Sequence, residues 1–271
     1  MKLVLARSGS ETPTSGIHLA TFNTGTISDV VIENSPETPT KGADGIFIEG
    51  ANSITIRNVR ITGLRNGIHN VGILLNGRAF SANAIHVFGG EISSNSGCGI
   101  FEDGASARLV GANFGNSYIG VTLEDNGSIG DAMTGNACIQ SGRAISFLGD
   151  YFENFSAVSY QAWIGDSSNQ PTGVVFVGNG FVSVKGTLAT LNLANSDGAT
   201  ISGNTEIGAI PSFIHHSRRS RRTFLFPNVF VAVGNANNEP PRIPGVSGAT
   251  SGVLNISGNP PDGRRIVKRE H

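Results

Sequence analysis

A short apolar pattern that recurs every 21 to 29 residues constrains this chain more than any other feature. Each copy opens with a glycine and continues with apolar residues in alternation, and four copies align, at 45–50, 72–77, 99–104 and 120–125. A second apolar segment follows each copy, as at 53–61. These segments are too short for amphipathic helices and are bounded by Gly, Asn, Asp or Ser, so we expect short β-strands.

Repeats of this length, each with two or three short strands, predict a solenoid whose turns stack about 4.8 Å apart. One turn cannot bury its apolar face alone, whereas stacked turns bury a continuous column. The 37 glycines of the 271 residues suit corners with positive φ. Asparagine also suits these corners, and it stacks in ladders that hydrogen-bond the next turn. Charged residues make up only 14%, which excludes a coiled coil or a helical array.

Charge divides the chain into two parts. Residues 1–210 carry 10 basic and 17 acidic side chains, a net charge of −7, and residues 211–271 carry 9 basic and 3 acidic side chains, a net charge of +6. This asymmetry predicts a boundary near residue 210. We expect a parallel β-helix over 1–210 and a C-terminal cap or oligomerisation tail over 211–271. Residues 223–233 are expected to form a cap or an inter-chain contact.

The stretches 42–48 and 53–59 resemble coils of the right-handed parallel β-helices of the pectin-lyase-like superfamily, and the resemblance covers about residues 15–210. It implies an all-β, single-stranded right-handed parallel β-helix of about eight coils with an irregular C-terminal cap. The tail resembles the region below the helix in phage tailspikes, where three chains meet, which implies a homotrimer. Because this fold hosts lyases, hydrolases, epimerases, tailspikes and adhesins, it implies no single activity.

Acidic residues gather in the third and fourth copies. If the aliphatic residues of each copy point inward, Asp103 and Glu124 face outward on adjacent turns, roughly 5 Å apart at the backbone. Glu102 stands where other copies carry an aliphatic residue, so it either points inward or shifts the register. Asp125 adds a fourth acid. Paired carboxylates perform glycoside hydrolysis, and crowding raises the pKa of one of them. We therefore expect these four residues to be the catalytic acids and bases.

The segment after these acids, 126–143, interrupts the repeat, and long excursions from a solenoid often carry function. It contains Asp131 and Arg143. Aromatic residues follow in nearby turns, and such rings suit sugar stacking. The expected substrate-binding residues are Tyr118, Arg143, Tyr151 and Trp163.

Other candidate residues are interpreted as structural. Cys98 and Cys138 match neither a disulfide framework nor a zinc motif, so we expect small buried residues. His69 and His86 lie in or beside strands, where a hydrogen-bonded structural role is expected. The arginine run over 218–222 is short and lacks interleaved aromatic residues, which favours a solvated loop or an intersubunit anion contact over nucleic-acid binding.

Three functional hypotheses remain open. The first is a tailspike- or depolymerase-type protein that binds a polysaccharide or cell-surface glycan and hydrolyses it. The second is a non-catalytic structural or adhesive β-helix, and the third is a bacterial lyase or epimerase acting on uronic acids. We expect no cofactor, no metal, no nucleic-acid partner and no membrane span, and a location outside the cell or on a virion.

Overall fold

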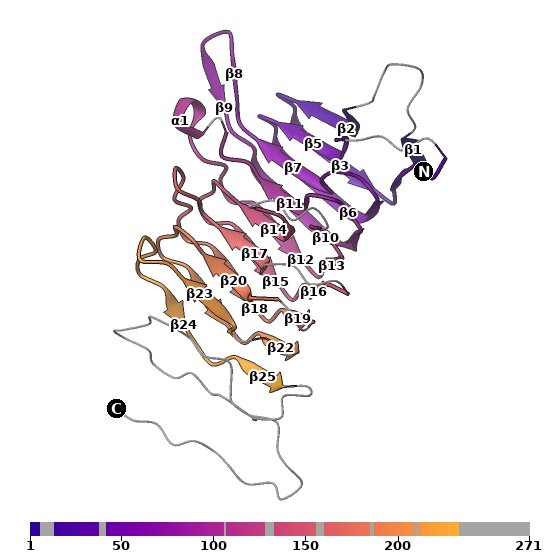
Figure 1. Ribbon diagram of the computed structural model, residues 1–271. Helices are drawn as coiled ribbons and strands as arrows, with labels where there is room; N and C mark the ends of the chain where they lie inside the picture. Colours follow the sequence, from indigo (N-terminus) through magenta and orange to yellow (C-terminus); the bar gives the residue numbers. More distant parts are fainter. Residues whose placement is uncertain are drawn as a thin grey trace, which may run out of the picture.

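The computed structural model describes residues 1–5, 14–37, 42–105, 107–127, 133–155, 160–184, 187–208, 210 and 212–232. In these ranges the chain winds as a parallel β-helix whose strands stack in sequence order (Figure 1). The predicted all-β solenoid is confirmed. One short helix, α1 (Ala107–Val110), lies beside the strands among the described residues.

One side of the helix is an eight-stranded parallel sheet, to which successive turns each contribute one strand. In spatial order its strands are β2 (Ser15–Ala20), β5 (Asp44–Glu49), β7 (Ile68–Val71), β11 (Cys98–Glu102), β14 (Gly135–Ile139), β17 (Tyr160–Ile164), β20 (Ala189–Leu193) and β23 (Ile214–His216).

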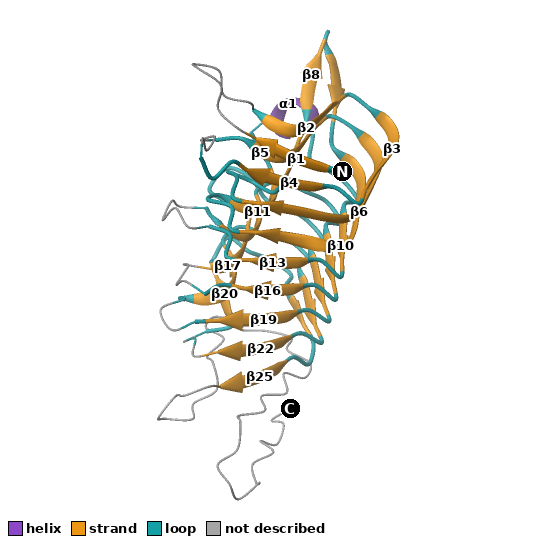
Figure 2. Cartoon of the chain, turned by 90° about the vertical axis from the view of Figure 1, so that its right-hand side faces the viewer, coloured by secondary structure: helices purple, strands orange, loops and turns teal. Residues whose placement is uncertain are grey.

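The remaining sides belong to a fifteen-stranded sheet with two arms, because β6 (Asn52–Thr62) and β10 (Asn83–Ser93) are long and each pairs with two strands of a neighbouring turn. The first arm adds β3 (Asn23–Ser28), β12 (Ser117–Ile119), β15 (Ser146–Leu148), β18 (Val175–Val177), β21 (Thr200–Ser202) and β24 (Phe224–Leu225). The second arm, face-on in Figure 2, adds β1 (Lys2–Leu5), β4 (Val31–Asn34), β13 (Thr122–Glu124), β16 (Tyr151–Glu153), β19 (Gly180–Ser183), β22 (Thr205–Gly208) and β25 (Val229–Ala232).

Glycine makes the corner between the two arms. On four successive turns the residue at this corner has a φ between 64° and 69°, a backbone conformation that residues with a Cβ rarely adopt. The four residues are Gly120, Gly149, Gly178 and Gly203. The role expected for the recurrent glycines is thus confirmed at this corner.

The core changes character along the helix. The first turns bury isoleucines such as Ile54, Ile56 and Ile61, whereas the later turns bury stacked rings. Phe147 stacks between Tyr118 and Phe176 with ring centroids 4.8 Å apart on each side. Parallel strands in register place identical positions directly above one another, so the rings stack face to face.

Buried asparagine ladders close the turns, as expected from the sequence. Asn179 Nδ2 donates to Asn204 Oδ1 at 3.0 Å, and Asn204 Nδ2 donates to Asn228 Oδ1 at 2.9 Å. The same Oδ1 atoms also accept backbone hydrogen bonds, because the Asn179 N–H donates to Asn204 Oδ1 and the Asn204 N–H donates to Asn228 Oδ1. These side chains therefore satisfy backbone groups that the corner leaves without a strand partner.

Two of the four aligned copies do not lie where the alignment placed them. Residues 72–77 belong to an antiparallel hairpin, β8 (Ile73–Leu75) and β9 (Arg78–Phe80), which projects from the helix (Figure 1). The strand of that turn in the eight-stranded sheet is β7 instead. Residues 120–125 contain β13 of the second arm rather than a strand of the eight-stranded sheet.

The helix extends past the boundary expected at residue 210. β23 pairs with β20, β24 with β21 and β25 with β22, so a further complete turn follows that position. Residue 233 and the tail to residue 271 lie outside the described residues.

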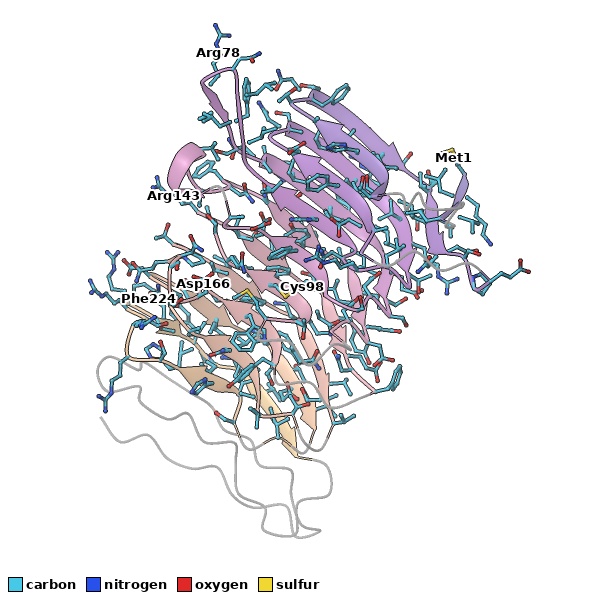
Figure 3. All side chains as sticks on the ribbon, turned by 45° about the horizontal axis from the view of Figure 1, so that its top comes forward. Met1, Arg78, Cys98, Arg143, Asp166 and Phe224 are labelled. Atoms are coloured by element: carbon cyan, nitrogen blue, oxygen red, sulfur yellow. A yellow bond between two sulfur atoms is a disulfide. The ribbon has the colours of Figure 1, made fainter. Side chains whose placement is uncertain are left out.

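The two cysteines are buried as expected, but they also form a disulfide, which corrects the sequence interpretation. Cys98 on β11 and Cys138 on β14 join adjacent turns, 40 residues apart in sequence (Figure 3). The bond became possible because the fold stacks the two strands, which spacing along the chain does not reveal.

Candidate functional site

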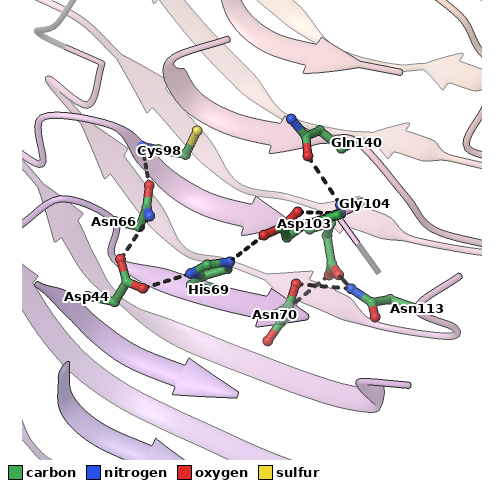
Figure 4. Close-up of polar contacts among 11 residues, drawn as sticks. Asp44, Asn66, His69, Asn70, Cys98, Asp103, Gly104, Asn113 and Gln140 are labelled. Carbon is green, nitrogen blue, oxygen red and sulfur yellow. Dashed lines mark hydrogen bonds and ion pairs between the residues drawn. The ribbon is translucent and has the colours of Figure 1, made fainter. Parts of the chain in front are cut away.

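Asp103 lies at an Asp–His–Asp cluster on the outer face of the eight-stranded sheet. His69 on β7 donates from Nδ1 to Asp44 Oδ2 at 2.7 Å and from Nε2 to Asp103 Oδ2 at 3.1 Å (Figure 4). The three side chains belong to three successive turns and have relative exposures of 9 to 15%. We call this group the histidine clamp. Because both ring nitrogens face carboxylates, both carry a proton and His69 is an imidazolium.

The clamp holds one imidazolium between two aspartates. Burial by itself lowers the pKa of His69, but the hydrogen bonds to Asp103 and Asp44 outweigh burial and raise it to about 9. Burial also opposes ionisation of Asp103, yet the hydrogen bonds from His69 and from the Ala105 N–H lower its pKa. His69 is therefore charged at neutral pH and cannot act as a general base.

Stacked rings surround the clamp. His69 lies between Phe47 and Phe101, with centroids 4.9 and 4.8 Å away, and His18 stacks on the far side of Phe47. These residues share one outward register position on four successive turns. Both faces of Phe47 and of His69 are therefore covered by neighbouring rings of the column.

Glu102 points inward, which was one of the two alternatives expected. It is fully buried, and its carboxylate accepts hydrogen bonds from four side chains: Asn70, Asn113, Asn116 and Tyr118. Burial raises the pKa of Glu102, and these donors act in the opposite direction. A carboxylate enclosed in this way stabilises the interior and meets no substrate at the surface.

Glu124 lies on a different side of the helix from Asp103, which corrects the expectation that the two share adjacent turns. Glu124 ends β13 on the second arm, where it pairs in register with Ser93 and Glu153. Glu91 lies two residues before Ser93 on β10. We call Glu91, Glu124 and Glu153 the acidic ladder.

The acidic ladder brings like charges together on an open sheet face. Burial, Glu91, Glu153 and Asp125 together raise the pKa of Glu124. The Tyr151 hydroxyl donates to Glu153 Oε2 at 2.8 Å, and burial together with that carboxylate raises the pKa of Tyr151 to about 12. Arg60 Nε lies 3.6 Å from Glu91 Oε1. The ladder thus contains a carboxyl group that holds its proton more readily than usual beside a second carboxylate on the next turn.

The other expected site residues are dispersed. Tyr118 is fully buried in the core stack, so its ring cannot lie against a sugar. Arg143 is exposed at a corner, where its backbone forms isolated β-bridges with Phe114 and Thr172 of the neighbouring turns. Trp163 on β17 lies outward on the eight-stranded sheet.

Asp125 accepts the Phe155 N–H at 2.6 Å beside the acidic ladder. Tyr151, 37% exposed, also lies at the ladder. Asp131, singled out in the excursion over 126–143, falls outside the described residues.

Sequence reasoning missed Glu91 and Glu153 as neighbours of Glu124, and it missed Asp44 as a partner of His69. The signal was present for Glu153, because it follows Glu124 by 29 residues, the length of one turn. Counting one turn onward from each acid, rather than aligning whole copies, would have found this pair.

The described residues contain no group of three His, Cys, Asp or Glu side chains arranged to hold a metal ion. They also contain no helix with the length and apolar character that a membrane crossing requires.

Comparison with known proteins reveals similarity of fold. No family model matches the sequence, and no curated protein matches it. A crystal structure of PfbA, a surface adhesin of Streptococcus pneumoniae, superposes with a TM-score of 0.52 at 12% identity, covering 85% of this chain and 65% of that one. The two chains share the β-helix fold.

Two further structures are more distant. Another structure of the same S. pneumoniae adhesin gives a TM-score of 0.48 at 12% identity, covering 85% of this chain and 70% of that one. Tailspike protein 3 of bacteriophage CBA120 gives 0.35 at 14% identity, covering 85% of this chain and 47% of that one. Because one fold hosts many functions, the function of this chain has to be argued from its own residues.

Proposed function

We propose that this protein is a glycan-binding β-helix that hydrolyses a surface polysaccharide at the acidic ladder. One observation carries the proposal: Glu124 and Glu153 lie in register on adjacent turns of an open sheet face, and the pKa of Glu124 is raised. Adjacent strands are about 4.8 Å apart, close to the roughly 5–5.5 Å between the two carboxyl groups of a retaining glycosidase.

The two carboxyl groups take different roles in this proposal. Glu124, which keeps its proton more readily, protonates the glycosidic oxygen as the general acid. Glu153 attacks the anomeric carbon as the nucleophile, and the hydrogen bond from Tyr151 orients it. Water then hydrolyses the glycosyl-enzyme intermediate, with Glu124 acting as the base.

The test is a panel of bacterial surface polysaccharides scored for binding and for new reducing ends. We expect Glu124→Gln and Glu153→Gln to reduce cleavage by at least about 100-fold while binding persists. Glu33→Gln is the matched control, because Glu33 belongs to the same outward column but lies beside Thr62 and pairs with Lys2. Binding by the native protein without new reducing ends would overturn hydrolysis, and products with unsaturated ends would favour the lyase alternative.

A second candidate, a structural or adhesive homotrimer, is favoured by an apolar stripe on the first arm. Four large apolar side chains share one outward register position on successive turns and are partly exposed: Phe88, Ile119, Leu148 and Val177. A row of this kind suits contact with a second copy of the chain. Leu148→Lys places a charge in its middle, so sedimentation analysis should detect smaller assemblies if the stripe is the interface, and unchanged mass would exclude it.

The proposed location is outside the cell or on a virion. The Cys98–Cys138 disulfide supports it, because such bonds persist in oxidising surroundings. Thiol titration of the protein isolated under non-reducing conditions tests this point, since two free thiols would contradict it.

A further inference from the structure

A pocket of about 630 Å³ lies where the turns after β17, β20 and β23 meet, away from the acidic ladder. We propose that this pocket, which we call the loop pocket, binds a sugar unit that carries a carboxylate, such as a uronate. The inference rests on the proposed glycan-binding function and adds a substrate class to it. Its volume falls in the range of small-molecule sites, about 300–1,000 Å³.

Cationic side chains without carboxylate partners line one wall of the loop pocket. Arg218 and Arg219 are exposed and form no ion pair with any carboxylate of the described residues. Arg222, in the same turn, differs, because it forms a two-pronged pair with Asp197. The unpaired guanidinium groups suit a carboxylate, which they bind through two parallel N–H donors.

The acid of the loop pocket is already engaged. Asp166 Oδ1 accepts the backbone N–H groups of Ser168 and Asn169 at 2.6 and 2.7 Å, and the Asn169 side chain donates to both oxygens. Asp166, labelled in Figure 3, therefore holds its own turn in shape. Two cations and one hydrogen-bonded carboxylate leave the wall positive.

Trp163 adds an apolar surface to the lining of the loop pocket. Its ring packs edge-on against Tyr160, with centroids 4.6 Å apart and planes at 84°. The indole nitrogen is buried, so the part of the ring that lines the pocket is carbon surface. Aromatic carbon surfaces pack against the C–H faces of sugar rings, whereas a free inorganic anion gains nothing from them.

The frame of the loop pocket is rigid. Trp163 pairs in register with Cys138, which the disulfide fixes to the preceding turn. Gly165 follows β17 with φ of 77°, and a Cβ there would lie 1.8 Å from the Asn195 carbonyl oxygen. Only glycine allows these turns to approach so closely, and a pre-formed site loses less entropy on binding.

Trp163 is the single tryptophan of the chain, so its fluorescence reports on this pocket alone. Titration with glucuronate and with glucose, at constant ionic strength, compares two sugars that differ only in the carboxylate. We expect glucuronate to change the emission saturably and to bind about tenfold more tightly than glucose, the effect of about one charged hydrogen bond. The double variant R218Q/R219Q should lose this preference, whereas R221Q, outside the pocket, should keep it.

Three results would overturn the inference: an equal response to both sugars, an unchanged preference in R218Q/R219Q, or competition by acetate as strong as by glucuronate. The last would indicate a simple anion site. Failure here is distinguishable from failure of the proposed function, because the fluorescence titration needs no polysaccharide cleavage and does not involve Glu124. If glucuronate bound to the loop pocket but no polysaccharide of the panel were bound or cleaved, the inference would hold and the proposed function would be wrong.

Discussion

The histidine clamp and the acidic ladder both bring carboxyl groups together across successive turns, on different sides of the helix. In the clamp, His69 lies between Asp44 and Asp103, and the pKa of Asp103 is lowered. In the ladder, Glu124 and Glu153 are direct neighbours without an ion-pair partner among the described residues, and the pKa of Glu124 is raised. The same stacking of turns therefore yields a structural site or a reactive one, depending on whether a cation occupies the turn between the acids.

Removal of the clamp's cation should have the largest effect on stability. His69→Ala leaves two mostly buried carboxylates unpaired, so we expect the free energy of unfolding to fall by about 3 kcal/mol. His18→Ala is the matched control on the same column, since His18 is 43% exposed and pairs with one carboxylate, that of Glu49, at 3.1 Å. Loss of that exposed pair should lower the free energy of unfolding, measured by chemical denaturation, by at most about 1 kcal/mol. Equal losses in the two variants would show that the clamp is not a strong charge site.

The next largest effect should be on the pH dependence of stability, which tests the charge state of the clamp. The pKa of His69 rises from 6.5 to about 9 on folding, so its contribution is complete below about pH 6.5 and is lost as pH rises through 9. Asp103 acts in the opposite sense, since its lowered pKa adds stability that is lost as pH falls below its ordinary value of 3.8. Denaturation midpoints across pH 6 to 10 should decline more steeply for the native protein than for His69→Ala, in which Asp150 and Glu206, with pKa values raised to about 8, still contribute a decline up to about pH 8. If the midpoints of the two proteins declined in parallel, the loss of stability would come from groups other than His69.

A direct titration tests the ladder. In Glu153→Gln one of the like charges near Glu124 is absent, so the pKa of Glu124 should fall toward its ordinary value of 4.5. Carboxyl chemical shifts followed by NMR across pH 3 to 8 measure this change. Glu33→Gln, on the same outward column, should leave the titration of Glu124 unaltered. No response to Glu153→Gln would mean that burial alone sets this pKa.

The smallest expected effect is a gain in stability. Glu124→Gln removes repulsion between like charges that lie directly opposite on neighbouring strands, which is worth about 0.2–1 kcal/mol. The gain should shrink in 1 M salt, because exposed charges are screened there. Calorimetry at low and high salt measures both quantities, and a loss of stability at either salt would contradict the description of the ladder as a site of repulsion.

Local pattern was sufficient for much of this fold. Short runs of alternating apolar residues, separated by Gly and Asn and repeated every 21 to 29 residues, favour stacked turns that share a core. The inward alternative for Glu102 followed from the same alternation, because a residue two positions after Ile100 returns to the same face of a strand. The corner glycines and asparagine ladders were likewise expected from composition.

The candidate site was harder to predict, because it depends on which strand each acid joins. Asp103 and Glu124 occupy equivalent places in similar sequence copies, yet one follows β11 of the eight-stranded sheet and the other ends β13 of the second arm. The hairpin of β8 and β9 misled the alignment in the same way, since its glycine-flanked apolar run imitates a turn of the helix.

The sequence by itself determined that this chain stacks short strands into a β-helix with glycine and asparagine at its corners, because period and turn chemistry are local properties. Tertiary structure alone decided that Glu124 and Asp103 lie on different sides of the helix, that His69 joins Asp44 to Asp103, and that Cys98 meets Cys138. The physical reason is register: loops of unequal length separate the strands, so neighbours across turns depend on how much chain each loop consumes, and that is settled only when the turns stack.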